Sequence, residues 1–187
     1  MPNYSDERAL FGIPGLDCID DFLKYLSDAD LREAVQTRFL DQTVPLLDRG
    51  CEIFVLAHSW GSVVAYDSLC QIDPTPDKGR VGRLFTIGSP LSMGWIARWV
   101  KKQPHAVKLD GRRPPIARGW TNLDARGDIV GGVLGEFRGV EERVGLTPTS
   151  CGTSMFGLVG PACAHSSYFD PANEVVARDI FARAIER

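Results

Sequence analysis

Apolar residues near the start of the chain recur in steps of three and four positions. The first such set is Ile19, Phe22, Leu23 and Leu26. This spacing is that of one helix face, so it predicts a helix from Asp17. A second helix is predicted to run to about Leu47, with Asp28 or Asp30 as its cap. Its inner face is expected to carry Leu31, Val35, Phe39 and Leu40.

Short apolar runs bounded by turn residues predict strands at 53–57, 84–87 and 117–123. The run 53–57 is apolar throughout, which suits a strand that is covered on both faces, as in a parallel sheet. The remaining helices are expected at 62–69, 94–100 and about 172–185, while residues 125–163 are rich in glycine and predict no element. Strands that alternate with helices indicate an α/β domain with a mainly parallel sheet flanked by helices.

The length of 187 residues fits a single domain, with 1–17 as an irregular N-terminal segment. The net charge of −3 comes with no dense basic face, so no nucleic-acid partner is expected. No apolar run approaches the roughly 20 residues that span a bilayer, so no transmembrane segment is expected. The N-terminus carries acidic residues where a signal peptide needs a basic start, and the predicted location is therefore cytoplasmic.

The chain has an odd number of cysteines and no C-x-x-C pair: Cys18, Cys51, Cys70, Cys151 and Cys163. This usage is typical of small buried residues in a reducing compartment. Cys151 and Cys163 would pair across a loop if the protein were exported without a leader, and the sequence leaves this pairing open. No zinc-ligand spacing, G-x-G-x-x-G or Walker loop is present, so no metal or nucleotide cofactor is expected.

The segment Ala57-His58-Ser59-Trp60-Gly61 joins an apolar strand to an apolar helix. A serine hydroxyl is a weak nucleophile unless it is exposed, held in place and next to a base. A sharp strand-to-helix turn would expose Ser59, with small residues two positions before and after it allowing close packing. The helix N-terminus would then point the Trp60 N–H at a developing oxyanion. The alternative is that Ser59 caps a helix in an ordinary α/β fold.

This segment resembles the nucleophile elbow of the α/β-hydrolase superfamily, G-x-S-x-G, with alanine in place of the first glycine. Two later segments match the family's order of serine, acid and histidine. RGWTNL followed by DARGDIV resembles the penultimate strand and acid loop, which implies Asp128 as the triad acid and leaves Asp124 as the competing candidate. AHSSYF resembles the segment before the family's last helix, which implies His165 as the base.

An imidazole suits the role of base because its pKa lies near neutrality, and a buried carboxylate must orient its second nitrogen. The chain has two other histidines, His58 and His105. His58 precedes the nucleophile on a strand end and is expected to point away from it, while His105 lies in a polar loop. Substrate contacts are expected from four residues, the last three of which belong to a segment that resembles the family's site-lining strand: His58, Ser89, Pro90 and Leu91. The rings of Trp60, Trp95 and Trp99 are expected to line an acyl pocket or to belong to the core.

The resemblance implies a reduced α/β-hydrolase-like three-layer sandwich and a lipase- or esterase-like serine hydrolase that cleaves a small-molecule acyl ester. It covers about residues 20–187, and the strands and second oxyanion donor that precede the elbow in full-length members are not found. One sheet edge would then be bare, to be covered by the N-terminal segment or by a second copy in a homodimer, unless the chain is truncated. The alternative function is a catalytically weak or inactive hydrolase-like scaffold that acts as a binding or assembly module.

Overall fold

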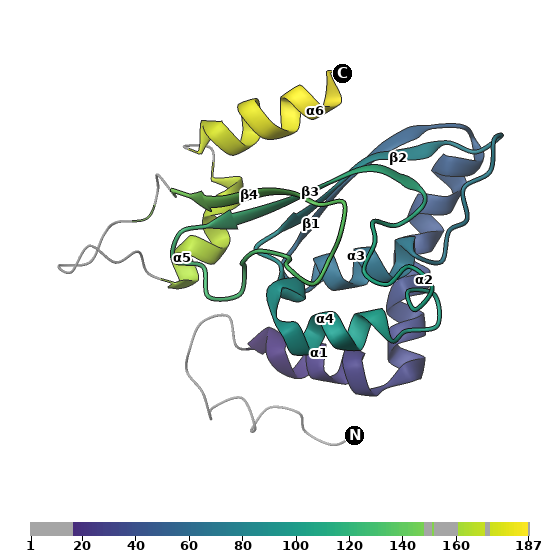
Figure 1. Cartoon of the computed structure of the whole chain (residues 1–187), viewed down its shortest axis with the longest axis horizontal. Helices are drawn as coiled ribbons and strands as arrows, with labels where there is room; N and C mark the ends of the chain where they lie inside the picture. Colours follow the sequence, from purple (N-terminus) through teal and green to yellow (C-terminus); the bar gives the residue numbers. More distant parts are fainter. Residues whose placement is uncertain (1–16, 148–150, 152–160, 171–172, 187) are drawn as a thin grey trace, which may run out of the picture.

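The computed structural model describes residues 17–147, 151, 161–170 and 173–186. Within them, four strands form one all-parallel sheet in the order β1-β2-β3-β4 (Figure 1). The strands are β1 (Glu52–His58), β2 (Arg80–Ile87), β3 (Ala117–Ala125) and β4 (Glu141–Leu146). The predicted α/β class with a parallel sheet is confirmed, and the three predicted strands are β1 to β3.

Helices cover both faces of this sheet (Figure 1). One face carries α1 (Asp17–Ser27), α2 (Ala29–Asp48), α3 (Gly61–Leu69) and α4 (Gly94–Lys101). The chain then forms the short helix α5 (Pro161–Ser166) and the 3₁₀ turn Ser167–Phe169. The other face is covered by the π-helical segment Val175–Ala182 and α6 (Arg183–Ile185). Across the described residues, no helix is both long and apolar enough to cross a bilayer.

The cap of α2 is Asp28, one of the two predicted candidates. Its carboxylate accepts hydrogen bonds from the backbone N–H groups of Asp30 and Leu31, each at 3.0 Å, which satisfies two of the unpaired donors at the helix start. Leu31 itself is 37% exposed, so its predicted place on the inner face is wrong. It lies in the first turn of α2, next to the capping Asp28, and is not among the residues of the larger core.

Two apolar cores lie on opposite sides of the sheet. The larger core joins α1 to α4 with one sheet face and includes Leu47, Val63, Leu69, Leu84 and Trp120. The smaller core lies under the C-terminal helical segment and consists of Phe85, Ile87, Leu123, Ala125, Tyr168 and Val176, with partly buried residues around them. Neighbouring positions of a strand point to opposite faces, which is why Leu84 and Phe85 belong to different cores.

Strand β1 lies at an edge of the sheet within the described residues. The prediction that 53–57 is covered on both faces is wrong for Leu56, which is 43% exposed and belongs to neither core. Among the described residues no strand pairs with the outer edge of β1, as the sequence led us to expect. Coverage by a second copy stays a prediction, and the irregular segment predicted for 1–17 lies outside the described residues up to residue 16.

Strand β4 was not predicted. Its sequence, Glu-Glu-Arg-Val-Gly-Leu, has few apolar residues and most of its side chains are exposed. The strand forms because its backbone pairs with β3 from Thr121 to Ala125. A polar edge strand of this kind carries little hydrophobic pattern for a sequence to reveal.

Candidate active site

The three residues of the predicted triad meet at the carboxyl ends of the strands. In a parallel sheet these ends share one edge, so the loops that follow different strands converge there. Ser59 follows β1, Asp128 lies in the loop after β3, and His165 lies in the last turn of α5. The chain thereby brings together side chains that are more than a hundred positions apart.

Ser59 occupies a sharp turn between β1 and α3. Its φ is 53°, in the left-handed region that few residues other than glycine adopt. The Ser59 N–H donates to the Ile87 carbonyl at 2.9 Å, and its own carbonyl accepts from the Ser62 hydroxyl at 2.5 Å. These bonds hold the strained backbone, and strain of this kind is found most often at functional sites.

His165 links the serine to the acid. Its Nε2 lies 2.9 Å from Ser59 Oγ, and its Nδ1 lies 3.0 Å from each carboxylate oxygen of Asp128. An ionised carboxylate only accepts hydrogen bonds, so Nδ1 carries the proton in the neutral ring and Nε2 presents its lone pair to the Ser59 hydroxyl. This is the tautomer that a general base next to a serine requires.

The Asp128 side chain is completely buried and fully hydrogen-bonded. Besides His165, it accepts from the Tyr168 hydroxyl at 2.7 Å and from the N–H groups of Val130 and Gly131 at 2.8 and 3.1 Å. Burial alone would raise the pKa of this carboxyl, but the four donors stabilise the charged form and lower the pKa to about 2. Asp128 is therefore ionised at neutral pH.

Asp124, the competing candidate for the acid, contacts the site differently. Its Oδ1 is buried and has no hydrogen-bond partner within the described residues. Burial, with the nearby charge of Asp128, raises the pKa of Asp124 to about 6. The structure therefore brings Asp128, and not Asp124, to the histidine.

Two residues that sequence reasoning did not assign to the site support this arrangement. Gly88 has a φ of 53°, and a Cβ there would lie 2.7 Å from Asp128 Oδ2 and 3.1 Å from His165 Nδ1, so only glycine fits. Tyr168 donates to Asp128 and accepts from the Ala125 N–H at 2.8 Å, which ties the acid to the end of β3. In the sequence, these two residues could have been found from the segments that contain them, Gly88-Ser89-Pro90 and His165-Ser166-Ser167-Tyr168.

The predicted oxyanion donor is the Trp60 backbone N–H, at the start of α3. Within the described residues this N–H donates to no protein acceptor. The Trp60 ring stacks on Phe22 at 3.5 Å between centroids, so it belongs to the larger core and not to an open pocket. Trp99 is likewise packed against the core, beside Tyr25, whereas Trp95 is 49% exposed.

The residues predicted to contact substrate have two kinds of surroundings. Ser89, Pro90 and Leu91 are buried, and the Ser89 hydroxyl is engaged with the Ser62 hydroxyl at 2.6 Å and the Leu91 N–H at 3.2 Å. Their role as substrate contacts stays a prediction. His58 is half-buried, and its ring lies against the ring of His165, with centroids 4.7 Å apart.

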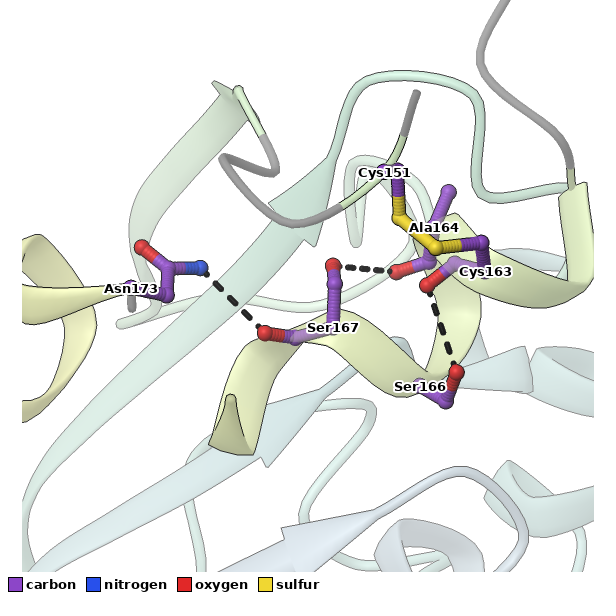
Figure 2. Close-up of a disulfide and its surroundings, with 6 residues drawn as sticks. All are labelled: Cys151, Cys163, Ala164, Ser166, Ser167 and Asn173. Carbon is purple, nitrogen blue, oxygen red and sulfur yellow. Dashed lines mark hydrogen bonds between the residues drawn. A yellow bond between two sulfur atoms is a disulfide. The ribbon is translucent and has the colours of Figure 1, made fainter. Parts of the chain in front are cut away.

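A disulfide joins Cys151 to Cys163, two residues before His165 (Figure 2). Just beyond it, the Ser167 hydroxyl donates to the Ala164 carbonyl at 2.9 Å, and Asn173 donates to the Ser167 carbonyl at 3.4 Å (Figure 2). The pairing that the sequence left open is thus present. The cytoplasmic location stays a prediction, which this crosslink weakens because disulfides persist mainly in oxidising compartments.

A hollow of about 310 Å³ lies away from the triad, between the sheet and the C-terminal helical segment. Its arginines form ion pairs with neighbouring acids, as in Arg83–Glu141 and Arg118–Glu52. Within the described residues, no group of three His, Cys, Asp or Glu side chains is placed to hold a metal ion. Comparison of the chain with protein-family models, curated proteins and solved structures found no match.

Proposed function

We propose that this chain is a serine hydrolase with a reduced α/β-hydrolase-like fold, which cleaves carboxylic esters through an acyl-enzyme on Ser59. The observation that carries the proposal is the 2.9 Å contact between Ser59 Oγ and His165 Nε2, with the other ring nitrogen held by a buried, ionised Asp128. A serine, an imidazole and a carboxylate in this order are the components of a nucleophilic triad.

The reaction follows from these positions. His165 Nε2 takes the Ser59 proton while Oγ attacks the ester carbonyl carbon, and the resulting oxyanion accepts a hydrogen bond from the Trp60 N–H. The C–O bond to the alcohol breaks, and His165 returns the proton to the departing alkoxide. Water, deprotonated by the same nitrogen, then attacks the acyl carbonyl carbon. The C–O bond to Ser59 breaks, His165 returns the proton to Ser59 Oγ, and the carboxylic acid leaves. Asp128 stabilises the imidazolium that forms in each half of the cycle.

Labelling with a fluorophosphonate probe tests the proposal. The native chain is expected to bind the probe covalently and to hydrolyse p-nitrophenyl butyrate, while Ser59→Ala and His165→Ala lose both properties. Ser27→Ala is the matched control, because this serine lies at the end of α1 and its hydroxyl bonds only the local helix carbonyls. It is expected to react like the native chain.

A folded native chain that neither binds the probe nor hydrolyses the ester would contradict the proposal. That result would favour the second candidate, a hydrolase-like scaffold that binds or assembles without catalysis. The observation behind this candidate is the single assigned oxyanion donor, since loss of one donor lowers rates by about 10²–10³. Retained activity in Ser59→Ala would exclude the triad mechanism altogether.

A further inference from the structure

His58 lies directly before the nucleophile, and its side chain bonds to the backbone of the base. Its Nε2 is 2.7 Å from the carbonyl oxygen of His165. A carbonyl oxygen can only accept a hydrogen bond, so His58 Nε2 must carry the proton and donate it. The tautomer of His58 is thus determined by its partner.

The carbonyl that accepts from His58 lies at the C-terminal end of its own helix. His165 lies in the last turn of α5, which ends at Ser166. The final four carbonyls of a helix have no intrahelical donor and need another partner. By supplying that donor, His58 connects the end of β1, where Ser59 begins its turn, to the turn that carries His165.

Aromatic rings hold His58 in this position. Phe169 and Tyr168 contact its ring edge to face, with centroids 5.6 and 5.9 Å away, and the His165 ring lies against it. Burial is the main reason that the pKa of His58 lies below its usual value, and the titratable groups that act on it are His165 and Asp128. A neutral His58 places no second positive charge beside the imidazolium that His165 becomes during the proposed reaction.

We propose that His58 is a positioning residue, which anchors the His165 backbone and packs against its ring so that Nε2 stays directed at Ser59. This inference rests on the proposed function and assigns His58 a role other than the substrate contact predicted from the sequence. His58 positions His165 through two features, the hydrogen-bond donor at Nε2 and the surface of its ring.

Two substitutions separate these features. His58→Gln retains an amide N–H at a similar reach, and His58→Phe retains a flat ring but has no donor. Because one neutral hydrogen bond is lost, kcat for p-nitrophenyl butyrate is expected to fall about tenfold in His58→Phe, with KM changed less than about twofold. His58→Gln is expected to keep kcat within about threefold of the native value. His105→Gln, in an exposed loop, controls for the loss of an imidazole and is expected to match the native chain.

The position of the proton gives a readout that does not depend on activity. Nitrogen-15 NMR of the native chain is expected to show His58 as the neutral Nε2–H tautomer at pH 7. An Nδ1–H tautomer would overturn the inference. A rise in KM with kcat unchanged in both variants would also overturn it, since that pattern indicates a substrate contact. If His58→Phe fails to fold, His58→Asn replaces it, because its shorter amide does not reach the carbonyl.

The failure of this inference and the failure of the proposed function give different results. Native-like kinetics in every His58 variant, while Ser59→Ala is inactive, would refute the positioning role alone. Absence of probe labelling in the native chain would refute the hydrolase proposal, and the NMR measurement would still report whether His58 donates to the His165 carbonyl.

Discussion

The two faces of the sheet differ in how they hold the residues of the proposed triad. The elbow that carries Ser59 leads into α3, whose residues are mostly buried in the larger core. His165 instead lies on a helix of six residues, whose following turn contributes Tyr168 to the smaller core. Ser59 is thus anchored by dense apolar packing, whereas His165 is held by hydrogen bonds, by the ring of His58 and by a disulfide.

This difference shows that a side chain of the site can be held precisely without a large apolar core on its side of the sheet. A short helix on the smaller core cannot be stabilised by its own length, because brief helices are marginal in water. Polar contacts from residues that are themselves well packed replace the missing apolar burial.

The largest effect is expected at Gly88, whose backbone lies against Asp128, Tyr168 and His165. A Cβ in Gly88→Ala would lie 2.7 Å from Asp128 Oδ2 and 3.0 Å from the Tyr168 ring, at a φ that disfavours alanine. Ester hydrolysis is expected to fall by at least about 100-fold, because small displacements of reacting groups have effects of this size. Gly135→Ala is the control, since its Cβ would meet nothing within 4 Å. Equal activity of both variants would contradict the assignment of Gly88.

Truncation of one side chain on each face measures the contrast in packing directly. Leu69 is fully buried in the larger core, and Leu69→Ala is expected to lower the free energy of unfolding by about 3 kcal/mol. Ile180 is only partly buried against the smaller core, so Ile180→Ala is expected to lower it by about 1 kcal/mol. Urea denaturation gives both values. A larger effect at Ile180 would show that the smaller core is the more important one.

Removal of the disulfide tests whether the crosslink contributes to holding the base. The bond closes a segment with a sequence separation of 12, for which the loss of chain entropy in the unfolded state stabilises the fold by about 3 kcal/mol. The double variant Cys151→Ser, Cys163→Ser is expected to be less stable by up to this amount, and its kcat is expected to fall several-fold. Cys51→Ser is the control, because Cys51 is a free thiol. Unchanged urea midpoints in the double variant would show that the crosslink contributes nothing.

A smaller effect is expected from the pH dependence of a carboxyl in the larger core. Burial is the main cause that raises the pKa of Asp67 to about 6, although Tyr25 and Gln36 donate hydrogen bonds to it. Because its folded pKa lies above the unfolded value near 4, Asp67 destabilises the fold progressively as the pH rises from about 4 to 6.

Asp67→Asn removes this ionisation and keeps one oxygen for both donors. It is expected to raise the free energy of unfolding by about 1 kcal/mol at pH 8 and by nothing at pH 4, as measured in urea. The ionisation of Asp128 contributes to stability with the opposite sign. Because its pKa is lowered in the folded state, it stabilises the fold above pH 4, and this contribution is lost as the pH falls towards 2. If Asp67→Asn is still more stable than the native chain at pH 4, the added stability does not come from removing the ionisation of Asp67.

The sequence alone was enough to predict most of the elements with a strong apolar pattern. The helices now described as α1 to α4 and the strands β1 to β3 were all expected, because apolar residues at helical spacing or in short runs bounded by turn residues can be recognised in the sequence. The order of Ser59, Asp128 and His165 along the chain also indicated which residues to compare. Spacing along a chain, however, does not give the distance between side chains, so Asp124 remained a competing candidate beside Asp128.

Tertiary structure decided the rest. β4 exists because β3 offers it a backbone partner, and the Cys151–Cys163 pairing depends on the path of the chain between them. The glycine at position 88 and the hydroxyl of Tyr168 gain their roles only when the loops after β2 and β3 meet α5. These features arise from contacts between residues far apart in sequence, whose geometry no local pattern encodes, and for the same reason only the folded chain reveals that His58 bonds to His165.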